Sequence, residues 1–270
     1  MRRRLHSVYE YLALWFGLGM LGFICLFWTP LLWVLYRLQP QSSGGRLGRY
    51  VNMTWLRFYL WTLSLSGACR FDIRGLDALR GQEPVIIAPN HPSLLDAVMV
   101  ISRLPNVVCI MKTGLMNNLF LGAGARLARY IGNESLMEMI RNSVETLRQG
   151  NHLLLFPEGT RTVREPVNRF TAAVGLIAHR ANVPVQTVII ESDSKYLCKG
   201  WPLFKRPSMP ITYRVRLGRR YEPPQDVRAF TSEMEQYFAG ELAAGTLVPD
   251  AQVKPSRPQQ SVSPNLANRA

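Results

Sequence analysis

The first seventy residues differ from the rest of the chain in the pattern of their hydrophobic and polar positions. From Tyr11 to Tyr36 there are 26 residues without a formal charge, rich in Leu, Phe, Trp and Gly. A helix of this length would exceed the hydrocarbon core of a bilayer, which is roughly 30 Å thick. A second apolar segment, Val51 to Cys69, contains only one charged residue, Arg57. Residues 1–70 are therefore predicted to form a membrane-embedded helical pair that anchors the protein.

The pattern leaves three arrangements of this pair open. Both segments can cross the membrane, the pair can lie in one leaflet, or the first segment alone can cross, interrupted at Thr29-Pro30. Arg2, Arg3 and Arg4 place the N-terminus on the cytoplasmic side by the positive-inside rule. The first two arrangements return the chain to that side, so the domain that follows is predicted at the cytoplasmic face of the membrane. A cleavable signal peptide is disfavoured, because the apolar segment is too long and has no small-x-small cleavage site.

Beyond Arg70, short apolar runs alternate with stretches of helical periodicity. The predicted strands are rich in Val, Ile or Leu and bounded by Gly, Pro or Asn: Pro84–Ala88, Val107–Lys112, His152–Phe156, Val183–Glu191 and Ile211–Leu217. The predicted helices are Ser93–Arg103, Leu115–Tyr130, Glu134–Gln149, Phe170–Ala181 and Gln225–Leu242. Strand–helix alternation implies an α/β fold with a mostly parallel sheet flanked by helices. We expect this domain over residues 71–248, and a disordered tail over 249–270, which is rich in Pro, Gln, Ser and Asn.

Composition and charge narrow the classes of partner. Of the 270 residues, 47% are hydrophobic and 19% are charged, which excludes wholesale disorder. The formal net charge is +14, and Arg supplies 27 of the 32 basic residues, which favours phosphate-bearing substrates or acidic membrane surfaces. Nucleic acid is not an expected partner, because the chain has no recognition motif for it and the apolar N-terminus would be unexplained. The four cysteines lie far apart, which indicates neither a metal site nor a disulfide framework and fits a reducing compartment.

One histidine has surroundings suited to proton transfer. His91 follows an apolar strand and is separated from Asp96 by Pro92-Ser-Leu-Leu. Pro92 suits the first position of a helix, and a histidine at or before that start can meet Asp96. The positive end of the helix disfavours imidazolium, so His91 could accept a proton while Asp96 orients the ring and stabilises the resulting charge. In the alternative interpretation, His91 caps the helix and Asp96 is an ordinary acid of its first turn.

A second cluster follows the predicted strand His152–Phe156. It comprises Glu158, Gly159, Thr160 and Arg161, directly after a proline. Parallel sheets bind ligands at the carboxyl ends of their strands, where this turn lies. Arg161 could hold a phosphate bidentately, and Gly159 would let backbone N–H groups approach an anion. Glu158 could neutralise Arg161 or orient an acceptor hydroxyl, and the alternative interpretation is a strand-ending turn with a surface ion pair.

These two motifs resemble those of the glycerolipid acyltransferase family, whose members include the lysophosphatidic acid acyltransferases. They read Asn90-His91-x-x-x-x-Asp96 and Phe156-Pro-Glu-Gly-Thr-Arg161, with the glutamate 67 residues after the histidine. The resemblance covers roughly residues 70–220 and includes Val183-Pro184-Val185, which is similar to a later motif of the family. It implies direct transfer of a fatty acyl group from acyl-CoA or acyl carrier protein to the hydroxyl of a lysolipid.

The resemblance also implies roles for the residues. His91 would be the general base with Asp96 as its partner, and the turn from Glu158 through Gly159 and Thr160 to Arg161 would shape the acceptor site. It implies no metal and no other cofactor. The implied partners are membrane lipids and the lysolipid acceptor, with acyl carrier protein as a further candidate.

The chain departs from the family at the residues that would recognise the acceptor. Asn133 stands where the family usually has an arginine that contacts the acceptor's phosphate. Loss of the guanidinium removes a charge and a bidentate fork, so phosphate affinity should drop unless a nearby cation compensates. Candidates are Arg126, Arg129 and Arg164, and Lys112 could face phosphates of the donor.

Two further motif positions depart from the family. Its Phe-Lys-x-Gly is replaced by Phe170-Thr-Ala-Ala, and the second proline of its last motif is Gln186. A lyso-aminolipid or another specialised lipid-linked acceptor therefore stays open beside lysophosphatidic acid. A non-enzymatic lipid-binding scaffold is a more distant alternative, disfavoured by the intact His91 and Asp96.

Overall fold

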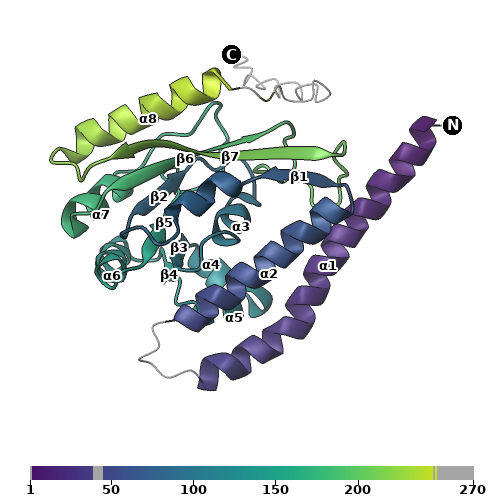
Figure 1. Ribbon diagram of the computed structural model, residues 1–270, viewed down its shortest axis with the longest axis horizontal. Helices are drawn as coiled ribbons and strands as arrows, with labels where there is room; N and C mark the ends of the chain where they lie inside the picture. Colours follow the sequence, from purple (N-terminus) through teal and green to yellow (C-terminus); the bar gives the residue numbers. More distant parts are fainter. Residues whose placement is uncertain (1, 39–44, 246, 248–270) are drawn as a thin grey trace, which may run out of the picture.

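The computed structural model describes residues 2–38, 45–245 and 247 and shows a seven-stranded sheet between two layers of helices (Figure 1). The strand order is β1-β7-β6-β2-β5-β3-β4. The strands are β1 Cys69–Asp72, β2 Ile86–Pro89, β3 Val107–Met111, β4 Ile131–Gly132, β5 His152–Leu154, β6 Val185–Ser192 and β7 Ile211–Tyr221. From β6 to β4 all neighbours are parallel, whereas β7 runs antiparallel to β6 and parallel to β1. The prediction of an α/β fold with a mostly parallel sheet is confirmed.

Two strands were not expected from the sequence. β1 alternates two apolar residues with Arg70 and Asp72 at one edge of the sheet, and β4 is two residues long at the other edge. Segments this short show no period that separates them from a loop. β7 was expected, and its direction follows from the chain, because the segment between β6 and β7 contains no helix to carry a parallel crossover.

The helices of the domain mostly fall where their periodicity indicates. They are α3 Asp96–Ile101, α4 Thr113–Met116, α5 Leu119–Leu127, α6 Leu136–Arg148, α7 Ala173–Ala181 and α8 Val227–Ala243, with a 3-10 helix at Arg74–Leu79. The Ser135 side chain accepts a hydrogen bond from the Glu138 N–H and so caps α6. Several expected bounds are wrong: α7 begins at Ala173 rather than Phe170, and β7 ends at Tyr221 rather than Leu217. α3 begins at Asp96 rather than Ser93, because a turn precedes it, and the helix expected over Leu115–Tyr130 is divided into α4 and α5.

Alternate residues of the central strands face two separate apolar cores. Ile87 and Leu154 point into the core shared with α3 and the N-terminal helices. Ile86 and Leu153 point to the opposite side, into the core shared with α6, α7 and α8. All four side chains are fully buried. Helices therefore cover both faces of β2 and β5, and the carboxyl ends of these strands are left for loops.

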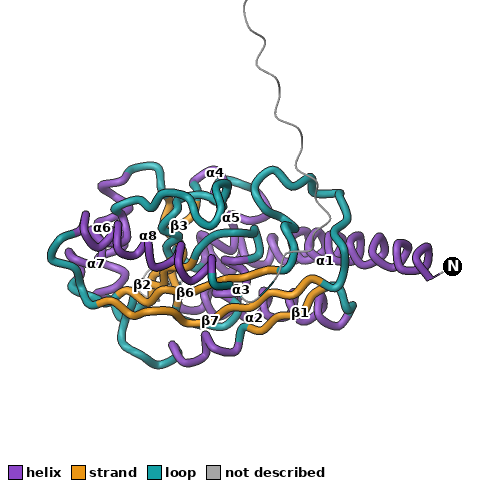
Figure 2. The backbone as a smooth tube through the Cα atoms, turned by 90° about the horizontal axis from the view of Figure 1, so that it is seen from above, coloured by secondary structure: helices purple, strands orange, loops and turns teal. Residues whose placement is uncertain are grey.

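The predicted N-terminal helices are α1, Arg2–Leu38, and α2, Arg46–Leu65, which lie side by side along the domain (Figure 1). α1 continues through Pro30 and extends past the edge of the sheet at its N-terminal end (Figure 2). Among the described residues, one helix is long and apolar enough to cross a membrane, namely α1 from Arg4 to Leu38. The predicted tail over 249–270 lies outside the described residues, as do residues 39–44 of the predicted turn-rich loop.

α2 is held on the domain by a buried face. Leu63 packs into the core beneath the sheet. Arg49 is buried and donates a hydrogen bond from Nη2 to Oδ1 of Asn151, at 2.9 Å. At Gly48 the helix meets the backbone of α5 so closely that a Cβ atom would overlap the carbonyl group of Leu127.

This close approach makes α2 sensitive to one methyl group. We expect Gly48→Ala to lower the free energy of unfolding by about 1–3 kcal/mol, the usual cost of overpacking, because neither backbone can give way. Gly22→Ala on α1 is the matched control, since nothing lies within 4 Å of a Cβ there and alanine is the better helix former. Denaturant unfolding in detergent measures both. Equal stability of the two variants would contradict the docking of α2 on α5.

Candidate active site

The register of the sheet brings the two sequence motifs together. β2 pairs with β5 in parallel, with Ile87 opposite Leu154. His91 and Glu158 each lie four residues beyond their member of this pair, so the two chains leave the sheet at the same level. The backbone N–H of His91 donates a hydrogen bond to Oε1 of Glu158, at 2.8 Å. His91 and Glu158, which are 67 residues apart in the chain, therefore lie in contact at one edge of the sheet.

Asn90 continues the strand pairing through its side chain. Its Nδ2 donates to the carbonyl oxygen of Ile190 at 2.8 Å, and its Oδ1 accepts from the Ile190 N–H at 2.7 Å. The side-chain amide of Asn90 therefore makes the two hydrogen bonds to β6 that backbone groups would make if β2 continued. This allows the main chain to turn away at the end of the strand and to present His91 above the sheet.

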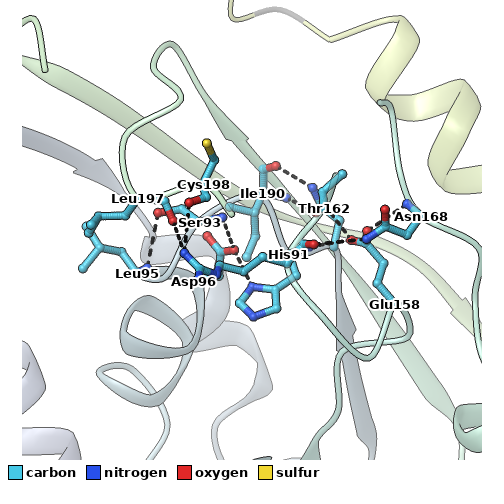
Figure 3. A network of polar contacts seen from close by, with 12 residues as sticks. His91, Ser93, Leu95, Asp96, Glu158, Thr162, Asn168, Ile190, Leu197 and Cys198 are labelled. Carbon is cyan, nitrogen blue, oxygen red and sulfur yellow. Dashed lines mark hydrogen bonds and ion pairs between the residues drawn. The ribbon is translucent and has the colours of Figure 1, made fainter. Parts of the chain in front are cut away.

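His91 and Asp96 form a hydrogen-bonded pair, drawn in Figure 3. Nδ1 of His91 lies 2.9 Å from Oδ2 of Asp96, and the same oxygen accepts from the Ser93 N–H at 2.7 Å. Because the carboxylate only accepts, Nδ1 carries the proton and Nε2 is left as the basic nitrogen. The expected meeting of these two residues is present, although a turn rather than a helix start lies between them.

Burial makes Asp96 a weaker acid than an exposed aspartate. The residue is 0% exposed, and its second oxygen, Oδ1, has no hydrogen-bond partner among the described residues. Loss of solvation raises the pKa of Asp96 to about 6, and the hydrogen bond from His91 acts in the opposite direction. A carboxylate that is costly to keep charged without a cation suits a group that must stabilise an imidazolium.

The imidazole ring is fixed but stays accessible. It stacks on the Phe156 ring, with centroids 4.0 Å apart and an interplanar angle of 23°. The side chain of His91 remains 17% exposed. Stacking and the bond to Asp96 together set the plane of the ring, so Nε2 points away from its carboxylate partner. The group can remove a proton from a hydroxyl that approaches this edge of the sheet.

Glu158 is buried and connects the loops that carry the two sequence motifs. It is 5% exposed, and Oε1 accepts from the Thr162 hydroxyl at 2.9 Å as well as from the His91 N–H. Oε2 accepts from the Asn168 N–H at 2.8 Å. The sequence suggested pairing with Arg161 or contact with an acceptor, but the carboxylate is occupied by the backbone and side chains of the two motif loops. Glu158 therefore links the two motif loops and has a structural role in the site.

Arg161 lies at the opposite side of the same turn. Its Nη1 donates to the carbonyl oxygens of Leu197 and Cys198, at 2.8 and 3.0 Å. Gly159 is exposed and has a φ of 66°, in the left-handed region that glycine adopts without strain, and Thr160 is half-buried beside it. The turn therefore presents Gly159 and Thr160 outward, while Arg161 is held by the segment that follows β6.

Sequence reasoning missed the residues that shape the loops around the histidine. Asn168 accepts hydrogen bonds from the N–H groups of Val163 and Arg164 through Oδ1, at 3.0 and 3.1 Å. The loop of residues 193–210, between β6 and β7, accepts at Tyr196 from the Ser93 hydroxyl, at 3.1 Å. Neither contact follows a helical or strand period, so only an unexplained asparagine in a loop could have suggested Asn168.

The position of Asn133 is now defined. It is exposed and follows β4 directly. Met111 pairs with Gly132, so Lys112, also exposed, lies beside Asn133 at the end of the neighbouring strand and one strand nearer to His91. Arg126, one of the expected substitutes, is turned towards α1, with its guanidinium 5.3 Å from the centre of the Trp33 ring. Lys112 is therefore a cation at the same level of the sheet edge as Asn133.

An apolar pocket lies between the N-terminal helices and the domain. Its lining includes Leu14 and Gly17 of α1, Tyr59 and Leu63 of α2, and Leu95, the neighbour of Asp96. The N-terminal helices thus form one wall of a hydrophobic space that reaches Leu95, the residue before Asp96.

Comparison with known proteins shows which sequences and which fold the chain is similar to. A family model described as acyltransferase matches residues 70–191. The chain is 23% identical over 224 residues to the 1-acyl-sn-glycerol-3-phosphate acyltransferase of Pseudomonas aeruginosa, covering 79% of this chain and 84% of that protein. It is 28% identical over 195 residues to the human 1-acyl-sn-glycerol-3-phosphate acyltransferase alpha, covering 69% of each. The crystal structure of the 1-acyl-sn-glycerophosphate (LPA) acyltransferase PlsC of Thermotoga maritima shares the fold, with a TM-score of 0.63, 17% identity and coverage of 90% and 97%.

Removing the imidazole tests the role of His91. We expect His91→Ala to lower acyl transfer by roughly 10²- to 10⁴-fold, the usual contribution of a general base, in a protein that still folds. His179→Ala is the matched control, because this histidine lies on α7 with Nδ1 bound to the Pro224 carbonyl oxygen. A purified His91→Ala protein with full activity would remove the assignment.

The acidity of Asp96 gives a second test. Because burial raises the pKa of Asp96 to about 6, the carboxylate is protonated below that pH, and we expect the rate to rise through about pH 6. The free energy of unfolding changes in the opposite direction. Because the folded state holds the proton of Asp96 more tightly than the unfolded state, this group stabilises the fold fully below pH 3.8. That contribution is lost as the pH rises to about 6.

Asp96→Asn should abolish both dependences. We expect a rate lowered by roughly 10²-fold or more and a rate profile without its step near pH 6. The difference in unfolding free energy between wild type and variant should shrink as the pH rises from about 4 to 6. A wild-type rate that is flat across this range would contradict the role given to Asp96.

Proposed function

We propose that this chain, in which residues 70–191 form an acyltransferase domain, transfers a fatty acyl group from a thioester to the free hydroxyl of lysophosphatidic acid. The observation that carries the proposal is the His91–Asp96 pair at the sheet edge, 2.9 Å apart, with no partner for Nε2 of the histidine among the described residues. Relatives that share this region are named 1-acyl-sn-glycerol-3-phosphate acyltransferases. The chain is an enzyme, so the interpretation as a lipid-binding scaffold is not retained.

In the proposed reaction, Nε2 of His91 takes the proton of the acceptor hydroxyl. The oxygen attacks the thioester carbonyl, and Asp96 stabilises the imidazolium that forms. The tetrahedral intermediate then breaks its C–S bond, and the leaving thiolate takes the proton back from His91. The products are the ester and a free thiol, of CoA or of acyl carrier protein. Neither a metal nor another cofactor takes part in these steps.

The acceptor's phosphate needs a cation at the same edge of the sheet. We assign this role to Lys112, which is exposed at the end of β3 beside Asn133. The turn at Gly159 and Thr160 would line the acceptor from the side of β5, with Arg161 shaping it from behind. Lys112 is a point charge rather than a planar fork, so it would hold the phosphate with less geometric selectivity than an arginine.

One observation favours a second acceptor class. Asn133 offers an amide, which can both donate and accept, where the related motif has a guanidinium. An amide suits an acceptor whose headgroup is uncharged or cationic, such as a lyso-aminolipid. The two proposals differ only in the acceptor and share the same chemistry at His91.

We further propose that α1 and α2 anchor the domain in a single leaflet. α1 contacts the domain near both of its ends: Glu10 pairs with Arg206, and Leu32 packs with Ala123 and Leu127 of α5. Twenty-two residues separate these contacts, about 33 Å of helix, which is about the thickness of the hydrocarbon core. A crossing helix could not keep both contacts with a domain on one side. The arginines at positions 2–4 support a cytoplasmic location for this face, because basic residues favour that side.

A panel of acceptors tests the proposed function. We expect higher kcat/KM with lysophosphatidic acid than with lysophosphatidylethanolamine or a lyso-aminolipid. Lys112→Ala should raise the KM for lysophosphatidic acid by about 10- to 100-fold, the worth of one charge-assisted contact, with little change in kcat. Asn133→Arg should lower the same KM. Arg148→Ala is the matched control, an exposed cation at the end of α6, ahead of β5.

The same panel separates the two acceptor classes. Preference for an acceptor without a phosphate monoester, unchanged by Lys112→Ala, would contradict lysophosphatidic acid as the substrate and support the second class. If the wild-type protein transfers no acyl group to any acceptor from either thioester donor, acyl transfer to lysolipids is contradicted.

A further inference from the structure

The β6–β7 loop, residues 193–210, exposes large apolar side chains among cations. Leu203 and Phe204 are 47% and 63% exposed. The loop contains three lysines and one arginine against one aspartate, a net charge of +3. Lys199 and Lys205 are exposed, and Lys205 lies 4.8 Å above the Trp201 ring. Apolar tips with cations beside them are typical of segments that sit at a membrane–water interface.

The loop is continuous with the apolar surface of α1. Phe204 stacks on Trp15, with ring centroids 5.4 Å apart, and yet both rings remain more than half exposed. Leu12 and Phe16 share a helical face with Trp15 and are also exposed. We call these five residues, Leu12, Trp15, Phe16, Leu203 and Phe204, the α1–loop patch. It joins segments almost 190 residues apart in the chain.

We propose that the β6–β7 loop is a second membrane contact, with the α1–loop patch inserted into the leaflet and Lys199 and Lys205 at anionic headgroups. This rests on the proposed attachment of α1 to the membrane. A bilayer fits better than a protein partner, because the exposed rings continue the apolar stripe of a helix already assigned to the lipid. The two lysines add attraction to acidic lipids, which weakens with salt.

The loop also contacts the active site. Its Leu197 and Cys198 carbonyl oxygens hold Arg161, and the Leu197 carbonyl accepts from the Leu94 N–H at 3.1 Å. Its Tyr196 carbonyl accepts from Ser93, the residue that donates its N–H to Asp96. A loop fixed in the leaflet at residues 203–204 therefore sets the height of His91 above the lipid surface from which the acceptor comes.

Fluorescent labels on single cysteines test the contact directly. The full chain with Cys25→Ser and Cys198→Ser receives Leu203→Cys, Phe23→Cys on α1, or Arg228→Cys on α8, each exposed. Each is labelled with an environment-sensitive dye and mixed with phosphatidylcholine–phosphatidylglycerol vesicles that carry a lipid-borne quencher. We expect quenching at positions 203 and 23 and none at 228. Quenching at 23 without quenching at 203 overturns the loop contact alone, whereas no quenching at 23 overturns the membrane attachment as well.

Charge reversal tests the nature of the surface. Lys199→Glu with Lys205→Glu should reduce quenching at 203 in vesicles with phosphatidylglycerol, and should raise the KM for vesicle-borne acceptor by about tenfold without changing kcat in detergent micelles. Arg148→Glu with Arg180→Glu, two exposed cations on α6 and α7, is the charge-matched control. Unchanged quenching, with a rate that falls only when acyl carrier protein is the donor, overturns the proposal and assigns the lysines to a protein partner.

Discussion

The parallel pairing of β2 with β5 is the constraint on which the site depends. It sets Ile87 opposite Leu154, and the chains that leave the two strands carry His91 and Glu158 to the same level. A slip of one residue would exchange the two faces of a strand and move apolar side chains out of both cores. The fully buried residues of these strands therefore fix the register, and the register fixes the site. Packing and catalysis use the same few positions.

The two carboxylates near the histidine are buried, and their hydrogen-bond partners determine what each one does. Glu158 and Asp96 are both buried, and each carboxylate is surrounded by N–H or hydroxyl donors of the loops beside it. Glu158 is fully satisfied and ties two loops together. Within the described part of the chain, one oxygen of Asp96 has no hydrogen-bond partner, so its charged form is costly and responds to the charge on His91. Two similar carboxylates thus do different work because their hydrogen-bond partners differ.

Strong periodicity made much of the fold predictable. The five runs of buried Val, Ile and Leu all became strands, since such runs have few other ways to hide from water. The pairing of His91 with Asp96 followed from their spacing after a strand. The roles of Glu158 and Asn168 did not, because their partners lie in loops whose shape depends on contacts between distant segments. The start of α3 was missed for a related reason: Asp96 binds the Ser93 N–H and His91, which favours a turn ahead of the helix.

The ion pair between Glu10 and Arg206 has a consequence for biosynthesis. The two residues are 196 positions apart, so at typical elongation rates of 5–20 residues per second the arginine is made about 10–40 s after the glutamate. Early in that interval the newly made helix α1 lacks its partners in α5, which is made about halfway through, and it lacks the β6–β7 loop until the end. The edge strand β1 also waits for a late partner, because Cys69 pairs with Ile211 of β7. The N-terminal helices must therefore be sheltered, by lipid or by a chaperone, before the ribosome finishes the domain that will hold them.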